Sequence, residues 1–464
     1  MKKSIFFVLV ILLIATLGAS SLSVYAYTPD FDIRSKSVIL ANADNGEVLF
    51  TRNENEKMYP ASLTKIMTAV LAIESTTDLD AEMVTAPDYI FNELAGTNSS
   101  TADIRRGETM SMRQMLACLL VQSANEAALI IADHVAGGVD EFVDKMNKKA
   151  EELGMTGTHY LNPHGLHEDG HYTTAADMYK LTNYAMKYPE FCEIVASSRY
   201  QIPATNKHTP RILVTTNRMM DRVNGGKYYY GAVNGTPIIR GIKTGYTSEA
   251  GRNLISLAKK DGSSFLCIVL GAPAEDENGR TLTENYSFED TIKLLDWAYN
   301  DFSYKEILSD EAPIAEIKLE LAKDKDSLKL VPEKSVSSYI PKEAEASSVF
   351  KKIDLISESV DAPIQQGDVL GTVTLMLADQ ELATVNLVAA ESVEKNEMLS
   401  VIRTLKNALS SIWFKIAAAA VILLILAYIA FSIYYNRVVR RRRAKQRSRS
   451  YRRYDDYDPF DDMH

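Results

Sequence analysis

The spacing of apolar residues divides the chain into regions with different predicted secondary structure. Apolar residues recur at the three- and four-residue spacing of an amphipathic helix in four segments: residues 62–74, 110–135, 139–153 and 287–299. Short apolar runs broken by glycines predict strands of one sheet at 238–242, 253–258 and 264–270. Residues 37–49 predict a hairpin with its turn at Asp44-Asn45-Gly46. This mixture predicts an α/β (α+β) domain over residues 27–302.

The pattern changes after residue 302. Apolar and polar residues partly alternate around Ile317 and again around Leu375, and Gly367 and Gly371 supply turns. Residues 303–392 therefore predict a small all-β domain. Residues 393–415 predict a helix that leads into an apolar segment near the C-terminus.

The N-terminus has the layout of a secretion signal. Two lysines precede an apolar run over residues 5–15, and Val24 and Ala26 occupy the small-residue positions that a signal peptidase reads. The run is about half of the roughly 20 apolar residues that a membrane-spanning helix needs. We therefore expect residues 1–26 to be a cleaved signal peptide.

Residues 416–435 form a second apolar segment, which has no charged residue. A helix of this length spans the ~30 Å hydrocarbon core of a bilayer. Aromatic pairs mark both ends: Trp413 and Phe414 lie just before the segment, and Tyr434 and Tyr435 are its last two residues. The arginine-rich segment 436–464 follows, and positive charge of this kind stays in the cytoplasm. We expect a single-pass membrane protein with its folded domains outside the cell and a cytoplasmic tail.

The charge of the exported part argues against nucleic acid as a partner. The whole chain has a formal net charge of −10, while the signal and the tail are basic. The part between them is therefore more acidic than the whole, which disfavours binding to phosphate backbones. Cys118 and Cys267 lie in apolar runs, so we expect buried free thiols and neither disulfide nor thiol chemistry.

Three short motifs carry candidate chemistry. Ser62 and Lys65 stand three residues apart at the start of a predicted helix, so the amine can reach the hydroxyl. Ser123 and Asn125 follow in the second helical region, and Lys243-Thr244-Gly245 ends a predicted strand. Each motif is common by itself. Their order and combination in an exported chain indicate an activated serine nucleophile.

With these motifs the chain resembles the penicillin-binding proteins and serine β-lactamases, whose motifs are S-x-x-K, S-x-N and K-T-G. The resemblance is closest to the low-molecular-mass D-alanyl-D-alanine carboxypeptidases. It extends to the flanking segments YPASLTKIMT (59–68), NPHGL (162–166), TAADM (174–178) and GIKTGYT (241–247). Residues 362–371 are similar to the β-rich C-terminal module of that family.

The resemblance implies a role for each motif residue. Ser62 would attack the peptide bond between the two terminal D-alanines of a peptidoglycan stem peptide and form an acyl-enzyme, and penicillins would acylate the same serine. Lys65 would be the base, with its pKa lowered by burial and by the like charge of Lys243. Ser123 would relay a proton toward the leaving amine. Asn125 would hold the peptide. Which group performs which proton transfer is left open by the sequence.

The remaining implied contacts concern the substrate's carboxylate and the oxyanion. Lys243, Thr244 and Thr247 would receive the carboxylate, and Gly245 and Tyr246 would complete the substrate-binding strand. The backbone N–H groups of Ser62 and Tyr246 would form the oxyanion hole. Relatives often carry a carboxylate-binding arginine just before the last helix of the catalytic domain, where this chain has Ser287. Arg252 and Arg280 are candidate substitutes.

Other functions compete with this interpretation. Four histidines crowd into residues 159–171, but they lack the spacing of a zinc site, so we expect no metal and no cofactor. A serine β-lactamase, a non-catalytic sensor of β-lactams or peptidoglycan, and a transpeptidase would share the acylation step. The membrane segment, the additional β-domain and the intact motifs favour a carboxypeptidase.

Overall fold

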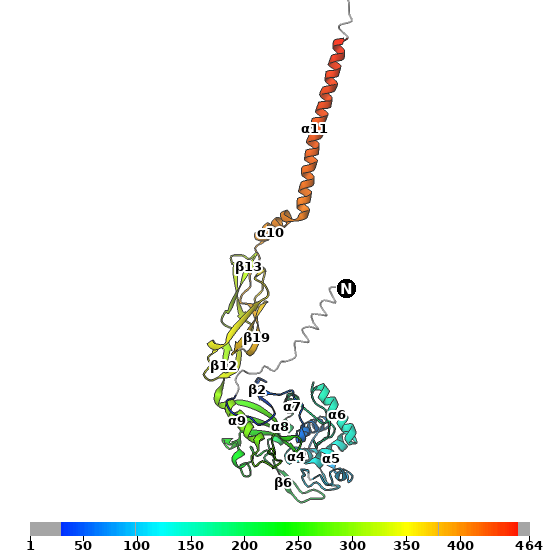
Figure 1. Cartoon of the computed structure of the whole chain (residues 1–464), viewed down its shortest axis with the longest axis vertical. Helices are drawn as coiled ribbons and strands as arrows, with labels where there is room; N and C mark the ends of the chain where they lie inside the picture. Colours follow the sequence, from blue (N-terminus) through cyan, green and yellow to red (C-terminus); the bar gives the residue numbers. More distant parts are fainter. Residues whose placement is uncertain (1–28, 98, 379, 453–464) are drawn as a thin grey trace, which may run out of the picture. The chain divides into compact units, whose positions relative to one another are not determined.

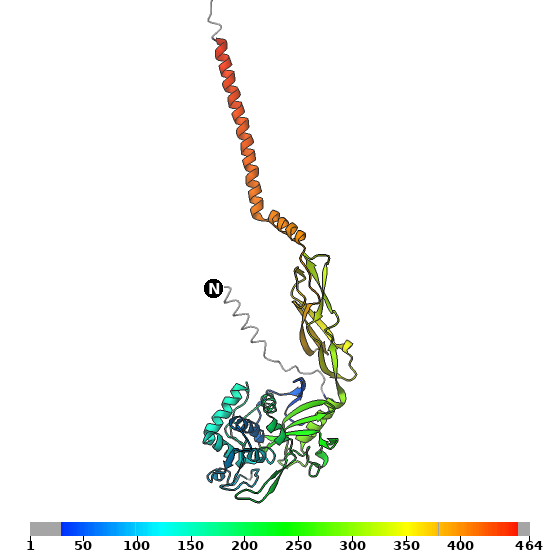
Figure 2. The ribbon, with the colours of Figure 1, turned by 180° about the vertical axis from the view of Figure 1, so that it is seen from behind.

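The computed structural model describes residues 29–97, 99–378 and 380–452 (Figures 1 and 2). Their contacts separate two compact units. The first extends to Ser309 and includes Lys334–Lys352 and Thr374–Thr384, and the second comprises the rest. The predicted signal peptide, residues 1–26, lies outside the described residues and stays a prediction.

The first unit contains an antiparallel five-stranded sheet with a helical layer on each face. Its strand order is β2-β1-β11-β10-β9, in which the hairpin β1 (Ser37–Asn42) and β2 (Val48–Arg52) joins β11 (Ser263–Ala272), β10 (Gly251–Lys260) and β9 (Ile239–Thr247). Successive residues of a strand face opposite sides. Ile39 and Ile268 accordingly belong to one core, and Leu40 and Cys267 to the other. The predicted α/β fold is confirmed.

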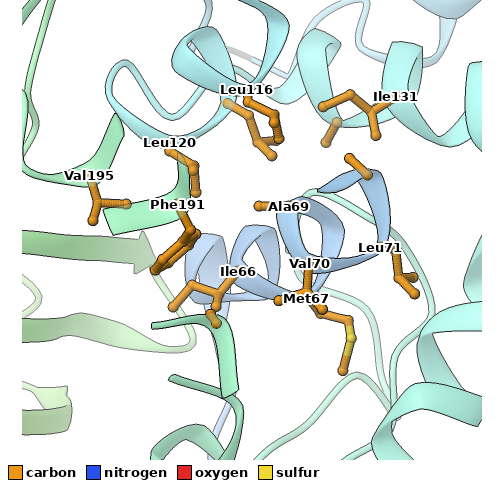
Figure 3. Packing of buried hydrophobic residues seen from close by; sticks show 14 of the residues in the cluster. Ile66, Met67, Ala69, Val70, Leu71, Leu116, Leu120, Ile131, Phe191 and Val195 are labelled. Atoms are coloured by element: carbon orange, nitrogen blue, oxygen red, sulfur yellow. The ribbon is translucent and has the colours of Figure 1, made fainter. Parts of the chain in front are cut away.

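Helix α2 (Lys65–Ser75) lies at the centre of the larger core. Nine of its eleven residues are buried, so it is apolar all round rather than amphipathic. Figure 3 shows its side chains among those of three neighbouring helices: Ile66, Met67, Ala69, Val70 and Leu71 with Leu116, Leu120, Ile131, Phe191 and Val195. This packing holds the start of α2, and with it the Ser62 motif, in a rigid setting.

The prediction of one continuous helical region over residues 110–135 is wrong. Strand β4 (Thr109–Ser111) comes first, then α4 (Met112–Leu120), a break, and α5 (Asn125–Ala136). Ser111 caps α4 through a reciprocal capping box with Gln114. In the break, Ser123 takes the positive φ of 63°, which a residue inside a helix does not adopt. Apolar residues continue across the break because residues 115–120 of α4 and 125–132 of α5 are all buried.

Further elements complete the first unit. They are β3 (Met83–Thr85), α3 (Ile90–Glu93), α6 (Val139–Glu152), α7 (Ala175–Ala185), α8 (Pro189–Val195), β5 (Arg199–Ile202), β6 (Arg211–Val214), η2 (Gly226–Tyr228), β7 (Ala232–Val233), β8 (Thr236–Pro237) and α9 (Tyr286–Asp301). Helix α9 covers the second face of the large sheet through residues such as Leu294, Leu295 and Trp297.

The later part of the chain is all-β, as the alternating pattern predicts. Strands β12 (Phe302–Leu308) and β15 (Val336–Pro341) form a pair, and a second sheet has the order β16-β18-β19-β14-β13-β17. Its strands are β13 (Ala315–Glu320), β14 (Ser327–Pro332), β16 (Phe350–Leu355), β17 (Ser359–Asp361), β18 (Val369–Leu377) and β19 (Gln380–Ala389), with the short helix η3 (Ala346–Ser348) between β15 and β16.

Two helices end the described chain. Figure 1 draws them as separate elements, α10 (Glu397–Ser410) and α11 (Ile412–Arg452). The segment Ile412–Ala444 contains an 18-residue window with a mean hydropathy of 2.8, none of which is buried, so the length and composition of the helix suit a membrane crossing. Helix α11 continues past the apolar segment into the basic one, where the sequence pattern predicted only a tail.

Candidate active site

Ser62 lies on a short turn between strand and helix. The turn η1 (Ala61–Thr64) follows Pro60, and α2 begins at Lys65. Asn253 of β10 holds the entry to this turn, because its Nδ2 donates to the carbonyl oxygens of Tyr59 at 2.9 Å and Pro60 at 3.1 Å. The buried Asn253 side chain therefore ties the nucleophile to the sheet. Sequence reasoning missed this residue, since a strand asparagine has no motif around it.

Two glycines let other segments approach the Ser62 turn. A Cβ on Gly165, which has φ +85°, would lie 1.9 Å from the carbonyl oxygen of Ala61. A Cβ on Gly245 would lie 3.0 Å from the oxygen of Pro60 and 3.2 Å from the nitrogen of Ser62. The backbone of β9 thus passes next to the N–H of Ser62. Both positions need glycine because a side chain would push the strand or loop away.

Lys65 is fully buried and its amine meets three oxygen atoms. Nζ lies 2.9 Å from Ser62 Oγ, 2.6 Å from Asn125 Oδ1 and 2.7 Å from the carbonyl oxygen of His164. The amide and carbonyl oxygens can only accept, so they take two N–H groups of the amine. A neutral amine then has its lone pair left for the hydroxyl proton of Ser62. These contacts would allow Lys65 to act as the general base that takes the proton of Ser62.

The electrostatics favour the same neutral form. Burial lowers the pKa of Lys65 well below its usual value, and the positive charge of Lys243 lowers it further, against an opposing effect of Glu126. Glu126 is itself buried and accepts from the hydroxyl of Thr101 at 2.6 Å and the N–H of Ala102 at 2.8 Å. This carboxylate secures the loop beside the site. Its place next to Asn125 in the sequence was the signal that could have found it.

Ser123 and Lys243 form a second pair within the site. Lys243 of β9 is buried, and its Nζ lies 2.9 Å from Ser123 Oγ and 2.9 Å from the carbonyl oxygen of Thr244. Burial lowers the pKa of Lys243 to about 7. The break between α4 and α5 aims Ser123 at this amine. A lysine that changes charge near neutral pH can exchange a proton with the serine.

Two cavities meet at Ser62. One, of about 400 Å³, has Ser62, Ser123, Thr244, Gly245 and Tyr246 in its wall. The other, of about 340 Å³, shares Ser62 and Tyr246 and adds Asn125 and Thr247. Together with the contacts of Lys65 and Lys243, these walls bring all nine predicted site residues together. Their joint arrangement gives a peptide room on both sides of the nucleophile.

The first cavity also settles where the candidate arginines lie. Arg252 and Ser287 line it, and so does Arg218, which sequence reasoning missed. Arg252 donates to the carbonyl oxygens of Glu284 and Leu282, and a guanidinium has further N–H donors for a ligand. Ser287 donates its hydroxyl to Asn285 at 2.7 Å and helps cap α9. Arg280 is highly exposed, pairs with Asp276 and is not part of this wall.

The loop histidines have structural partners. His171 Nδ1 accepts from the N–H of Leu161 at 3.2 Å, so its Nε2–H faces Thr64 Oγ1 at 2.9 Å. His164 Nδ1 accepts from the N–H of Leu166 at 3.1 Å. Burial lowers the pKa of His164 to about 3 and that of His171 to about 4, so both rings are neutral. Within residues 29–97, 99–378 and 380–452, no group of three His, Cys, Asp or Glu suits a metal ion.

The fold and the site define a class of enzyme that acts through an activated serine with a buried lysine beside it. Comparison with known proteins makes this specific. Residues 23–274 match the family described as D-alanyl-D-alanine carboxypeptidase, and residues 302–395 match the domain described as penicillin-binding protein 5, C-terminal domain. The chain belongs to the D-alanyl-D-alanine carboxypeptidase family.

Individual relatives agree over most of the chain. It is 31% identical over 370 residues to D-alanyl-D-alanine carboxypeptidase DacF of Bacillus subtilis, covering 79% of this chain and 88% of that protein. It is 28% identical over 378 residues to D-alanyl-D-alanine carboxypeptidase DacD of Escherichia coli, covering 80% and 89%. Penicillin-binding protein 5 of Haemophilus influenzae is similar in structure, with a TM-score of 0.58, 27% identity and coverage of 80% and 100%. The family predicted from the three motifs is confirmed.

Proposed function

We propose that this chain is a serine D-alanyl-D-alanine carboxypeptidase that removes the terminal D-alanine from peptidoglycan stem peptides. The observation that carries the proposal is the contact set of Lys65. Two oxygen acceptors occupy its N–H groups, and the third neighbour is Ser62 Oγ at 2.9 Å. A buried amine in this setting takes the hydroxyl proton as the oxygen attacks a carbonyl carbon.

Acylation then proceeds through a tetrahedral intermediate. Ser62 Oγ bonds to the carbonyl carbon of the penultimate D-alanine while its proton passes to Lys65. The negative charge on the carbonyl oxygen is met by the backbone N–H groups of Ser62 and Tyr246, and a donor of this kind contributes about 3 kcal/mol. The closeness of Gly245 to the nitrogen of Ser62 supports this placement.

Ser123 and Lys243 then serve the leaving group. The bond between the carbonyl carbon and the nitrogen of the terminal D-alanine breaks, and Ser123 gives its proton to that nitrogen while Lys243 replaces it. An ester on Ser62 and free D-alanine result. A proton then passes from Lys65 to Lys243, which returns both amines to their starting forms. Water attacks the ester and gives a proton to Lys65. As the bond between the carbonyl carbon and Ser62 Oγ breaks, Lys65 gives that proton to Oγ, and the shortened peptide leaves with Ser62 restored. A β-lactam would form the same ester, but its ring-opened product stays attached.

The substrate's carboxylate fits the first cavity. Thr244, whose Oγ1 lies 2.5 Å from Thr216 Oγ1, provides a hydroxyl there, and Arg252 provides a guanidinium on the adjacent strand. Because Arg252 pairs in register with Tyr246, it projects from the same face of the sheet as Thr244. Arg252 thus replaces the arginine expected at position 287. Asn125 and Thr247 contact the rest of the peptide in the second cavity.

The enzyme works outside the membrane and is anchored by residues 416–435. This anchoring is supported by helix α11, whose most apolar window is not buried by the described chain, and by the arginines that follow that window. The positive charge places the tail 436–464 in the cytoplasm and the folded domains on the opposite side. Cleavage of residues 1–26 leaves one crossing.

The proposal is tested by incubating the full chain in detergent with a pentapeptide ending in D-Ala-D-Ala. We expect D-alanine release that disappears in Ser62→Ala, together with a lasting covalent penicillin adduct on wild type alone. Unchanged release in Ser62→Ala contradicts the assignment. Rapid penicillin turnover favours a β-lactamase, cross-linked dimeric products favour a transpeptidase, and acylation without D-alanine release favours a sensor.

A further inference from the structure

The two cavities that meet at Ser62 have walls of opposite charge. Arg218 and Arg252 are the charged side chains in the wall of the first cavity. Within the described chain, the wall of the second cavity contains neither lysine nor arginine, and its acidic residue is Glu249. Its other polar residues carry hydroxyl, amide and imidazole groups. Charged walls favour ligand groups of the opposite sign, so the two sides of the nucleophile suit different parts of a peptide.

Glu249 lies in the tight turn that joins β9 and β10. Thr247 ends β9 and pairs in register with Gly251, the first residue of β10. The N–H of Ala250 donates to Thr247 Oγ1 at 3.1 Å and closes the turn. Gly251 has φ +68°, and a Cβ there would lie 2.6 Å from the carbonyl oxygen of Ala272 in β11. The turn is thus packed closely against the sheet, which gives Glu249 a defined place beside the second cavity.

The carboxylate of Glu249 has no partner in the described part of the chain. The residue is exposed, and none of the described ion pairs or side-chain hydrogen bonds includes it. The imidazole in the same wall pairs elsewhere. His167 Nε2 lies 3.7 Å from Asp169 Oδ1, and its ring contacts Tyr59 edge-on, with 4.6 Å between the ring centroids. The negative charge of Glu249 is therefore available to a ligand.

The position of Glu249 along β9 indicates which part of the substrate it meets. Strand β9 is an edge of the five-stranded sheet, and an edge strand can bond an extended peptide. With the substrate's carboxylate beside Thr244 and the scissile carbonyl beside Gly245, the preceding residues run antiparallel to β9, past Thr247 and toward the turn. Glu249 follows Gly245 by four residues, at most about 13 Å along a strand. The residue before the two D-alanines starts one Cα step of about 3.8 Å beyond the penultimate one. A long side chain that ends in an amine, as in lysine, reaches from there toward the carboxylate.

We propose that Glu249 is a specificity residue, which pairs with a cationic amine on the side chain of the substrate residue that precedes the two D-alanines. The inference rests on the proposed function and names the peptides that the second cavity accepts, those with a lysine-like side chain at this position. Arg252 meets the carboxylate at one end and Glu249 meets the amine at the other, so the peptide is held on both sides of Ser62. An apolar side chain loses the ion pair, and an acidic one is repelled.

Steady-state kinetics with matched peptides test the proposal. The full chain in detergent is given peptides that end in X-D-Ala-D-Ala, with the α-amine of X acetylated, where X is lysine, norleucine or glutamate. Norleucine keeps the carbon stem of lysine and lacks the amine. Release of D-alanine gives kcat/KM for each peptide in wild type, in Glu249→Gln and in the control Glu151→Gln, which changes an exposed residue of α6 in neither cavity wall. Penicillin labelling of Ser62 verifies that each variant is folded.

We expect wild type to prefer the lysine peptide over the norleucine peptide about 5- to 10-fold, between the effect of an exposed ion pair and that of a hydrogen bond between charged groups. The preference should be lost in Glu249→Gln and persist in Glu151→Gln. Added salt should reduce it in wild type, because screening weakens an ion pair at the surface.

Three results overturn the proposal: equal kcat/KM for both peptides in wild type, a preference that survives in Glu249→Gln, and an equal loss for both peptides in that variant. In the second case another group meets the amine, and in the third the carboxylate holds the turn instead of the substrate. D-Alanine is still released in all three, so the proposed function stands and only the specificity is refuted. Absence of release from every peptide refutes both.

Glu249→Lys tests the same contact with the charges exchanged. We expect this variant to prefer the glutamate peptide over the lysine peptide, the reverse of the wild-type order, because the ion pair now forms with the opposite signs. Glu151→Lys changes the net charge by the same amount away from both cavities and should keep the wild-type order. If the two variants shift the ratio equally, the effect comes from the overall charge of the protein and Glu249 is not a specificity residue.

Discussion

Lys65 and Lys243 are both buried amines of one site, yet they stand in different surroundings. Lys65 meets two acceptor oxygens and the nucleophile, whereas Lys243 meets the hydroxyl of Ser123 and one carbonyl oxygen. Burial lowers the pKa of both, and the charge of Lys243 adds to the effect on Lys65. Sequence alone presents two lysines in two motifs. From their contacts we propose that the first serves the nucleophile and the second the leaving group.

The two amines also depend on each other. Like charges in a buried site disfavour double protonation, so a protonated Lys243 helps keep Lys65 neutral. One lysine can then accept a proton while the other is able to donate. Predictions that separate the two roles follow.

Lys65→Arg has the largest expected effect. Arginine stays protonated at any working pH, so Ser62 loses its base. We expect kcat/KM for D-alanine release to fall about 10²- to 10⁴-fold, the usual contribution of general base catalysis. Rates of penicillin acylation should fall in parallel. The exposed Lys145→Arg on α6 is the control and should stay within about twofold. Retention of most activity by Lys65→Arg assigns the base elsewhere.

Ser123→Ala comes second. It removes the hydroxyl that lies 2.9 Å from Lys243 Nζ and interrupts proton delivery to the leaving nitrogen. We expect a loss of about 10²-fold for the peptide substrate. A thioester analogue, in which a thiolate leaves without needing a proton, should lose far less. Equal losses for both substrates, measured as kcat/KM, show that Ser123 acts on binding or on the nucleophile instead.

Arg252→Gln should follow with about a 10- to 100-fold loss, since a hydrogen bond between charged groups contributes about 1.5–3 kcal/mol. The physical reason is the lost pairing with the substrate's carboxylate in the first cavity. Steady-state kinetics should assign most of the loss to kcat/KM for free-acid substrates. Arg280→Gln, exposed and paired with Asp276, is the matched control. Equal behaviour of the two variants removes Arg252 from substrate recognition.

The pH dependence gives the smallest effect at neutral pH. The protonated form of Lys243 supplies the proton that the leaving nitrogen receives through Ser123. Activity should therefore fall as the pH rises through the Lys243 pKa of about 7. The neutral form of Lys65 is required at the same time, so activity also falls toward acid and kcat/KM is bell-shaped. Lys243→Arg keeps its proton, and the alkaline limb should move upward. A limb that stays near pH 7 in this variant belongs to another group.

Much of the fold was predictable from the pattern of residues. The apolar runs of β1 and β11 and the helical spacing in α2 and α9 identify the elements. The two strands are buried on both faces and α2 is buried nearly all round, whereas α9 buries one face against the sheet. The boundary between α4 and α5 was not predictable, since both helices continue the same apolar periodicity. Helix α2 and residues 416–435 illustrate the same limit. Both are strongly apolar, but the first is buried by other parts of the protein, whereas the described part of the chain does not bury the second.

The sequence by itself determined the family and predicted the reacting groups, because the three motifs fix chemical types in a fixed order. It also determined which segment is apolar enough to cross a membrane. Tertiary structure alone decided that Ser123 points at Lys243, that Asn253 and two glycines hold the Ser62 turn, and that Arg252 shares a cavity wall with Ser287. These contacts join residues far apart in the chain. Their distances and burial, which set the pKa values, arise only when the sheet and helices pack together.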